Sequence, residues 1–178
     1  MLKNTTDQYG WIAKLFHWVV ALSVFGLFAV GIWMVDLDYY NSWYTQAPFL
    51  HKSAGVLLAV IMLCRLIWRI INITPAPLTS HTHWEVITAR IAHGLFYSLI
   101  FLMVISGYLI STADDRPIDV FGWFEIPSLG SLIDNQADIA GLAHEWLAYL
   151  LIALASIHAL AALKHHFIDK DTTLKRMI

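Results

Sequence analysis

Five of the nine histidines lie inside stretches of sequence that are almost free of charge. An ionisable side chain at membrane depth is costly and is a candidate functional residue for that reason. His144 and His158 are fourteen residues apart, close to a whole number of helical turns, so they share one helix face about 21 Å apart. Neutral imidazoles are ligands of haem iron, zinc and copper. The five are His17, His51, His93, His144 and His158.

These histidines belong to a chain of 178 residues that is 58% hydrophobic and 13% charged, with a mean hydropathy of +0.62. Because soluble domains are about 25% charged, the composition excludes a disordered chain and a basic nucleic-acid-binding domain. Cys64 is the only cysteine, which excludes an internal disulfide, and no C-x-x-C-H motif is present for covalent haem attachment. An integral membrane protein remains.

The apolar residues fall into four segments, each long enough to cross a membrane. About 20 apolar residues cross a hydrocarbon core about 30 Å thick, and the alternation typical of a membrane β-barrel is missing. The sequence therefore predicts an all-α integral membrane four-helix bundle, with residues 1–178 forming one domain. The spans are expected near residues 13–35, 48–71, 88–112 and 140–163.

Basic residues are distributed unevenly between the two sides of the predicted bundle. If the N-terminus is inside, nine of the eleven basic residues are cytoplasmic and only Lys52 and Arg116 are outside. The positive-inside rule therefore predicts that both termini are cytoplasmic. The first apolar stretch has no A-x-A cleavage site, so we expect it to remain attached.

Two connections between the spans differ in character. Residues 72–82 contain Pro75 and Pro77 and predict a short linker that breaks the helix. Residues 113–138 form the longest loop, which we expect to fold back over the outer ends of the helices. Residues 169–178 are typical of a polar cytoplasmic tail.

Each end of the predicted bundle contains one histidine from the last helix and one from an earlier helix. His17 and His158 lie at the inner end, and His51 and His144 lie at the outer end. This arrangement predicts two bis-histidine haem sites stacked across the membrane. The residue one turn after each of these histidines is small, as a porphyrin requires, whereas bulky Tyr97 follows His93. The small residues are Ala21, Gly55, Ala148 and Ala162.

Two other interpretations of the histidines stay open at this point. They can simply hydrogen-bond neighbouring helices, with no cofactor. Zinc or copper also binds imidazole, as in a histidine-lined metal transporter. However, no set of Cys, Asp or Glu residues completes a four-ligand site, because Glu145 stands alone.

The ordered histidines and the residues around them resemble the bacterial di-haem cytochrome b561 family of four-helix inner-membrane proteins, over nearly the whole chain. The resemblance implies two haem b groups, the inner one bound by His17 and His158 and the outer one by His51 and His144. It also implies a multi-pass protein of the bacterial inner membrane, and it adds the option of superoxide oxidation coupled to ubiquinone reduction. The matching residues are His17-Trp18, His51, Gly55, Arg65, Arg69, Thr74-Pro75-Ala76-Pro77, Ala92-His93-Gly94, His144-Glu145, His158-Ala159, His165-His166, Asp171, Thr173-Leu174 and Arg176-Met177.

Three basic residues are candidates for binding haem propionates. Arg65 lies fourteen residues after His51, so it shares that helix face at the inner level, where a guanidinium can hold a carboxylate bidentately. Arg69 is one turn further. Both arginines can instead mark the membrane boundary, which is an equal alternative for Arg65 and the favoured interpretation of Arg69. Lys52, beside His51, is the candidate at the outer haem.

Two histidines are candidates for a quinone site. His165 lies seven residues after His158, near the lipid–water boundary, where it could exchange protons with a quinone. His93 is the second candidate. The alternative is that His165 and His166 are solvated residues of the tail.

Six-coordinate bis-histidine iron has no open position, which favours one-electron transfer over oxygen chemistry. The leading hypothesis is a membrane oxidoreductase that exchanges electrons with the quinone pool. The predicted outer loops are acidic, so their field repels superoxide and suits a basic periplasmic redox protein. The alternative is a non-catalytic haem-bearing anchor subunit that relays electrons for a separate dehydrogenase or hydrogenase. The acidic residues are Asp36, Asp38, Asp114, Asp115, Asp119, Glu125, Asp134 and Asp138.

Overall fold

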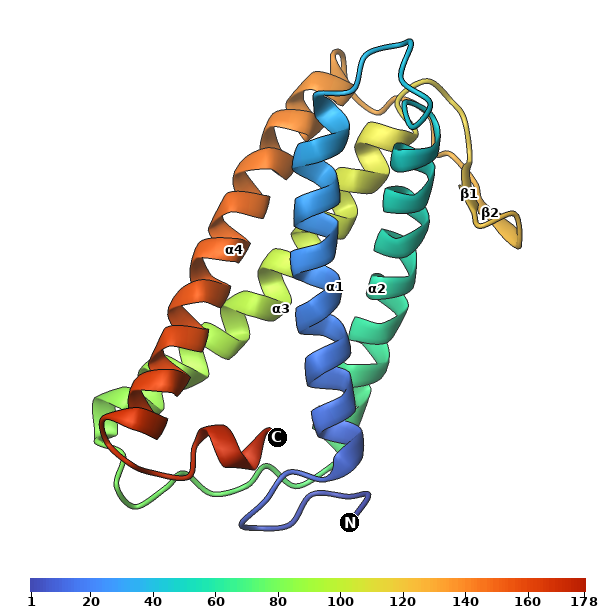
Figure 1. Cartoon of the computed structure of the whole chain (residues 1–178). Helices are drawn as coiled ribbons and strands as arrows, with labels where there is room; N and C mark the ends of the chain where they lie inside the picture. The colour runs from blue at the N-terminus through green and yellow to red at the C-terminus, as the bar shows by residue number, and fades with distance from the viewer.

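Four long helices run between the two ends of the molecule, and both chain termini lie at the same end (Figure 1). This computed structural model describes residues 1–178. The predicted four-helix bundle is confirmed, and every helix is long and apolar enough to cross a membrane. The helices are α1 (Trp11–Val35), α2 (Gln46–Ile71), α3 (His83–Ser111) and α4 (Gln136–Phe167).

Helices α3 and α4 extend beyond the predicted spans because polar residues stabilise their ends. At the start of α3, Thr82 and Glu85 form a capping box in which the Thr82 backbone N–H donates to the Glu85 carboxylate at 2.9 Å. At the start of α4, the Gln136 side-chain amide donates to the Leu109 carbonyl at 2.9 Å. The prediction of apolar spans did not include these polar turns, which continue the helices past the apolar segments.

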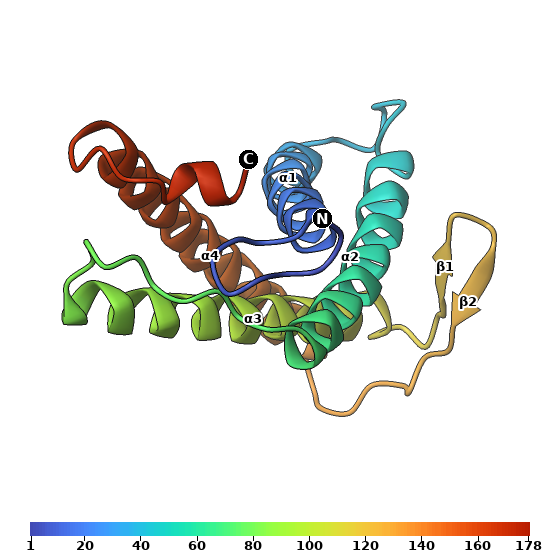
Figure 2. The same cartoon turned by 90° about the horizontal axis from the view of Figure 1, so that it is seen from below.

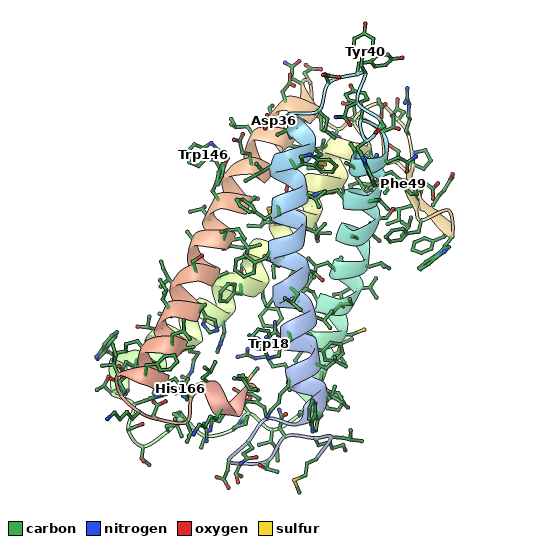
Figure 3. The ribbon with its side chains drawn as sticks, viewed as in Figure 1. Trp18, Asp36, Tyr40, Phe49, Trp146 and His166 are labelled. Carbon is green, nitrogen blue, oxygen red and sulfur yellow. The ribbon has the colours of Figure 1, made fainter.

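Most large apolar side chains lie on the outside of the bundle. Only 16 of the 178 residues are buried, while Trp146 is 62% exposed and Leu22 is 68% exposed. Figure 3 shows Trp146 pointing outward from α4, with Trp18 and His166 near the end that holds the termini and Tyr40 at the opposite end. An apolar surface of this extent needs a lipid environment to cover it.

The buried core forms a single apolar layer halfway along the bundle. Leu58 lies seven residues from both His51 and Arg65, and Leu151 lies seven residues from both His144 and His158. The layer therefore separates two levels of polar side chains: the level nearer the end that holds the termini is called the inner level, and the other is called the outer level. Its members are Val20, Val24, Leu58, Met62, Ile100 and Leu151.

The long connection between α3 and α4 contains a β-hairpin that the sequence analysis did not predict. Strands β1 (Ile118–Val120) and β2 (Phe124–Ile126) pair antiparallel, with Val120 opposite Phe124. The Ser53 hydroxyl of α2 donates to the Asp119 carbonyl at 3.2 Å and accepts from the Phe121 backbone N–H at 3.1 Å. The hairpin therefore packs against the side of α2 (Figures 1 and 2), so this part of the loop does not cover the helix ends as expected.

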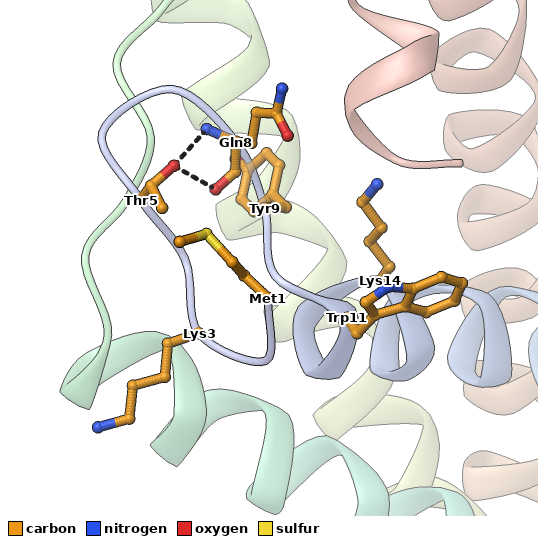
Figure 4. Close-up of a pocket in the computed structure, with 7 residues that line it drawn as sticks. All are labelled: Met1, Lys3, Thr5, Gln8, Tyr9, Trp11 and Lys14. Carbon is orange, nitrogen blue, oxygen red and sulfur yellow. Dashed lines mark hydrogen bonds between the residues drawn. The ribbon is translucent and has the colours of Figure 1, made fainter.

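The first ten residues form a loop that returns to the start of α1. Figure 4 shows the Thr5 hydroxyl hydrogen-bonded to the Gln8 backbone beside a cavity of about 120 Å³. A side chain at Gly10 would collide with the backbone of Leu2 and Lys3, so only glycine fits where the loop crosses itself. None of the predicted ligands lines this cavity, so it is a structural feature of the N-terminal loop.

The C-terminal tail, predicted from the sequence as a polar segment, is folded against the bundle. It contains a short 3-10 helix, η1 (Leu174–Arg176), that lies between the inner ends of α4 and α1 (Figure 2). The Trp18 indole N–H donates to the Met177 carbonyl at 2.7 Å, and the Lys14 ammonium donates to the Ile178 carbonyl at 2.6 Å. These side chains satisfy backbone groups of the tail, which explains why a polar segment is held in place.

Candidate functional site

At the outer level, His51 of α2 faces His144 of α4. Their ring centres are 6.3 Å apart, and the ring planes are inclined by 69°. Metal–imidazole bonds are about 2.0 Å long, so two imidazoles on opposite sides of one metal ion have ring centres about 6.3 Å apart. The two side chains are therefore spaced as a pair of axial ligands requires.

The serine at position 106 fixes the tautomer of His144. The Ser106 hydroxyl donates to the Met103 carbonyl at 3.0 Å, and its oxygen lies 2.9 Å from Nδ1 of His144. Because the hydroxyl proton is used for Met103, the serine accepts the proton of Nδ1, which leaves Nε2 of His144 free as a ligand. Ser106 was not among the predicted site residues, although a serine inside an apolar helix and next to Gly107 is a usable signal.

Changing Ser106 to alanine is expected to weaken haem binding at the outer level. Loss of the hydrogen bond that orients a ligating histidine lowers metal affinity by about 10–100-fold. In the haem that stays bound, the midpoint potential should rise, because His144 loses the hydrogen bond that makes its ring more electron-donating. Redox titration of the purified protein measures both effects. Ser98→Ala, at an exposed serine of the same helix, is the matched control, and an equal effect of both substitutions would contradict the role of Ser106.

Small residues leave room beside the outer pair. A Cβ atom at Gly31 would lie 3.4 Å from Cε1 of His51, and one at Gly107 would lie 3.3 Å from Cε1 of His144. A Cβ atom at Gly55, one turn after His51, would meet nothing within 4 Å. Nδ1 of His51 is buried and has no hydrogen-bond partner. A cavity of about 290 Å³ adjoins this ring, and it is lined by Ser23, Gly26, Leu27, Val30, Leu50, His51 and Ala54.

At the inner level, three histidines lie together. The ring centre of His158 is 6.4 Å from that of His17 and 5.6 Å from that of His93. Phe96 of α3 also contacts the His158 ring, with ring centres 5.4 Å apart. Only the His17–His158 separation matches the distance of about 6.3 Å expected for two axial imidazoles. His93 is therefore a neighbour of the pair, packed against His158 from α3.

Arg65 lies at the inner level, where the sequence analysis placed it. Its guanidinium nitrogen is 3.3 Å from Nδ1 of His17, and because arginine only donates, this Nδ1 accepts. If His17 held a metal through Nε2, its Nδ1 would carry a proton, so Arg65 would have to leave this nitrogen and could then bind a carboxylate. Arg65 and Arg69 both lie over the ring of Tyr97, at 5.7 and 5.6 Å from its centre.

The basic residues of the outer level are arranged differently. Lys52 is half-buried beside His51. The guanidinium of Arg116 forms a salt bridge of 3.1 Å with Asp114, and both side chains are exposed. The charge of Arg116 is thereby offset, which leaves Lys52 as the candidate cation next to the outer pair.

The two histidine pairs suit haem better than a small metal ion. Neither pair belongs to a group of three or more His, Cys, Asp or Glu side chains with converging ligand atoms. Zinc sites need four ligands, three of them from the protein even in catalytic sites, whereas haem iron needs only two axial ligands from the protein. Trp68 of α2 adds a buried indole N–H without a partner at the inner level, a donor that the sequence analysis did not identify.

A separate cluster of polar residues lies at the inner end, between the α2–α3 linker, the end of α4 and the tail. His165 is only 14% exposed, and its Nδ1 lies 2.7 Å from the carboxylate of Asp169. The interpretation of His165 as a solvated residue is therefore wrong. Burial raises the pKa of the Asp171 carboxyl, but hydrogen bonds from Thr173 and His81 outweigh burial and bring the pKa below its ordinary value.

Comparisons with known proteins agree on one family. The model of the family described as prokaryotic cytochrome b561 matches residues 8–178. The chain is 51% identical to cytochrome b561 homolog 2 of Escherichia coli (strain K12), over 98% of this chain and 93% of that protein. It is 28% identical to the probable superoxide oxidase CybB of Yersinia pestis, over 91% of this chain and 90% of that one. It is 27% identical to cytochrome b561 homolog 1 of Escherichia coli (strain K12), over 91% and 92% of the two chains.

Proposed function

This chain belongs to the prokaryotic cytochrome b561 family, and from that premise we propose that it is a di-haem cytochrome that passes single electrons between a donor at the outer face and the ubiquinone pool. The family implies a multi-pass protein of the bacterial inner membrane that transfers electrons through b-type haem. The observation that carries the di-haem proposal is the presence of two histidine pairs, with ring separations of 6.3 and 6.4 Å. They lie on opposite sides of the apolar core layer.

The proposed ligands hold each iron by two imidazoles from different helices. Haem held by two imidazoles would supply reversible one-electron chemistry rather than oxygen binding. His51 and His144 close the outer site, and Ser106 sets the tautomer of His144. His17 and His158 close the inner site, where Arg65 is the proposed partner of a propionate. The apolar core layer lies between the two levels.

The charge of the outer face influences which electron donor can approach it. Superoxide is supported as a donor by the name of one relative, a probable superoxide oxidase. The connections at this end are acidic, and Arg116 is paired with Asp114, so the surface field repels an anion. That field favours a basic redox protein as the second candidate donor.

The proposed quinone site lies at the inner end, near His165. This residue is on α4, seven positions after the proposed inner ligand His158, and its side chain is mostly buried at the end of the helix. His93 packs directly against the His158 ring, which leaves it less suited to contact a separate quinone. We therefore prefer His165 as the residue that hydrogen-bonds the quinone.

Purified, haem-loaded protein in ubiquinone-containing vesicles is expected to form ubiquinol when a one-electron donor is added outside. Superoxide and a basic cytochrome c serve as the two donors, and haem reduction and ubiquinol formation are followed by absorbance. With superoxide, the rate of haem reduction should rise with salt, because salt screens the repulsion by the acidic face; with the basic protein it should fall. Lys52→Met is expected to slow reduction by superoxide.

Other outcomes would contradict parts of this proposal. If both haems are reduced but ubiquinol never forms, the protein is a relay and the quinone assignment is wrong. The anchor-subunit function would then apply, and a dehydrogenase or hydrogenase partner should co-purify with the protein. If superoxide fails at every salt concentration while the basic protein donates efficiently, superoxide is not the donor.

A further inference from the structure

A cluster of potential metal ligands lies at the inner end of the molecule, away from both histidine pairs. Nε2 of His81, Nδ1 of His165 and a carboxylate oxygen of Asp171 all lie within 4.8 Å of one another. They come from three separate segments: the α2–α3 linker, the last turn of α4 and the tail. Figure 3 shows His166, the neighbour of His165 in sequence, at this end of α4.

We propose that His81, His165 and Asp171 form a binding site for one divalent transition-metal ion, with Zn²⁺ as the best match. Imidazole and carboxylate are both zinc ligands, with bonds of about 2.0–2.2 Å, which place tetrahedral ligand atoms about 3.3 Å apart. The oxygen of Asp171 is 3.1 Å from Nε2 of His81 and 3.6 Å from Nδ1 of His165. These two separations bracket the expected value.

The ligand atoms are held in place before an ion binds. One carboxylate oxygen of Asp171 accepts the backbone N–H of Thr173 at 2.8 Å, which directs the other oxygen toward His81. Nδ1 of His165 is buried and lacks a partner with hydrogen-bond geometry, although carboxylate oxygens lie nearby. A metal ion would satisfy this nitrogen and replace the proton that His81 shares with Asp171 and Thr173.

A second group of ligand atoms overlaps this one but suits a cation less well. Glu85, His165 and Asp169 also converge. However, the Lys164 ammonium lies 2.7 Å from the Asp169 carboxylate and 3.5 Å from that of Glu85. This fixed positive charge already neutralises both carboxylates and would repel a metal ion. In the group of His81, His165 and Asp171, the Asp171 carboxylate is paired with the two histidines and with no lysine or arginine, whereas His165 also contacts the Asp169 carboxylate that Lys164 neutralises.

A metal ion here would fasten the tail to the bundle. Beyond Asp171, the Arg176 guanidinium donates to the Ala76 carbonyl at 2.8 Å, and the tail ends on Trp18 and Lys14 of α1. Trp18 follows the proposed ligand His17 in sequence. The ion would therefore lock a segment that packs beside the inner histidine level. It would also occupy Nδ1 of His165, but the proposal does not depend on the quinone function.

The test uses haem-loaded protein in nanodiscs, stripped with a chelator and titrated with Zn²⁺ by calorimetry, with the bound metal counted by mass spectrometry. We expect one Zn²⁺ per chain. His81→Ala and Asp171→Asn should each weaken binding by about 100-fold or more, since even loss of a hydrogen-bond partner of a metal ligand lowers affinity by about 10–100-fold. His83→Ala, at an exposed histidine two residues from His81, is the matched control and should bind as the wild type does.

Haem content and a single elution peak show that each variant is folded, and His81→Ala changes only a linker residue. Hydrogen exchange gives a second readout, because Zn²⁺ should slow exchange in residues 169–178 of the wild type and leave the His81→Ala protein unchanged. Absence of stoichiometric Zn²⁺ binding to the wild type would overturn the proposal. If Zn²⁺ still binds after both His81→Ala and Asp171→Asn, the ion binds elsewhere and the proposal is wrong. The proposal is also wrong if His83→Ala weakens binding as much as these two substitutions do.

Discussion

Replacing His144 with alanine is expected to remove one of two haems and to leave the other in place. His144 and His51 come from different helices and face each other at 6.3 Å, so loss of either ring removes one axial ligand of the same iron. His51→Ala should therefore give the same product as His144→Ala. The haem-to-protein ratio should fall from two to one, and one of the two midpoint potentials should disappear from the redox titration.

The inner pair is expected to behave in the same way. His17→Ala and His158→Ala should each remove the haem that remains in the His144→Ala protein. The midpoint potential that these variants lose should be the one that the His144→Ala protein keeps. His166→Ala is the control, because this histidine is on α4 as well but belongs to neither pair; it should retain both haems.

Substitution of His93, the third histidine of the inner level, is the strictest test of the proposed inner ligand pair. The His93 ring lies 5.6 Å from that of His158, closer than His17 at 6.4 Å. If His93→Ala loses a haem while His17→Ala keeps both, His93 is the ligand and the assignment of His17 is wrong.

Electron transfer through the membrane is expected to require both histidine levels. His144 and His158 are fourteen residues apart on one helix, which corresponds to about 21 Å, most of the thickness of a hydrocarbon core of about 30 Å. In a variant that lacks one haem, no cofactor lies between the remaining haem and the opposite surface of the membrane. His144→Ala and His158→Ala should therefore both lower the transfer rate to that of vesicles without protein.

Vesicles loaded with ferricyanide and supplied with dithionite outside measure this transfer directly, as loss of ferricyanide absorbance. Either orientation of the protein conducts, so mixed insertion does not obscure the result. Ser98→Ala serves as the control with both haem levels intact. A single-haem variant that conducts at the wild-type rate would show that the two levels do not form one path.

The number and apolar character of the helices could be read from the sequence because lipid imposes one simple requirement. Each span must be long and apolar, and each ionisable residue inside it stands out. His144 and His158 could be placed on one face from helical geometry alone. The levels of His51 and His17 followed from the alternating direction of successive spans. The structure places these histidines beside each other as that reasoning requires, while their role as haem ligands remains a prediction.

Features that depend on contacts between distant segments could not be predicted. The hairpin at residues 118–126 is stabilised by Ser53, more than sixty positions earlier in the chain. The tail is held by Trp18 and Lys14 across the whole sequence. The contact of Ser106 with His144 forms only because α3 packs against α4, which brings the two side chains to 2.9 Å. Such pairs leave no local pattern in a single sequence, since each residue alone is ordinary.

The haem content of the purified wild-type protein tests the central claim most directly. Haem and polypeptide are quantified on the same sample, and the coordination of the iron is determined by low-temperature electron paramagnetic resonance. We predict two haem b groups per chain, both low-spin with two imidazole ligands. A single haem per chain, or a high-spin ferric signal from iron with an open position, would contradict it.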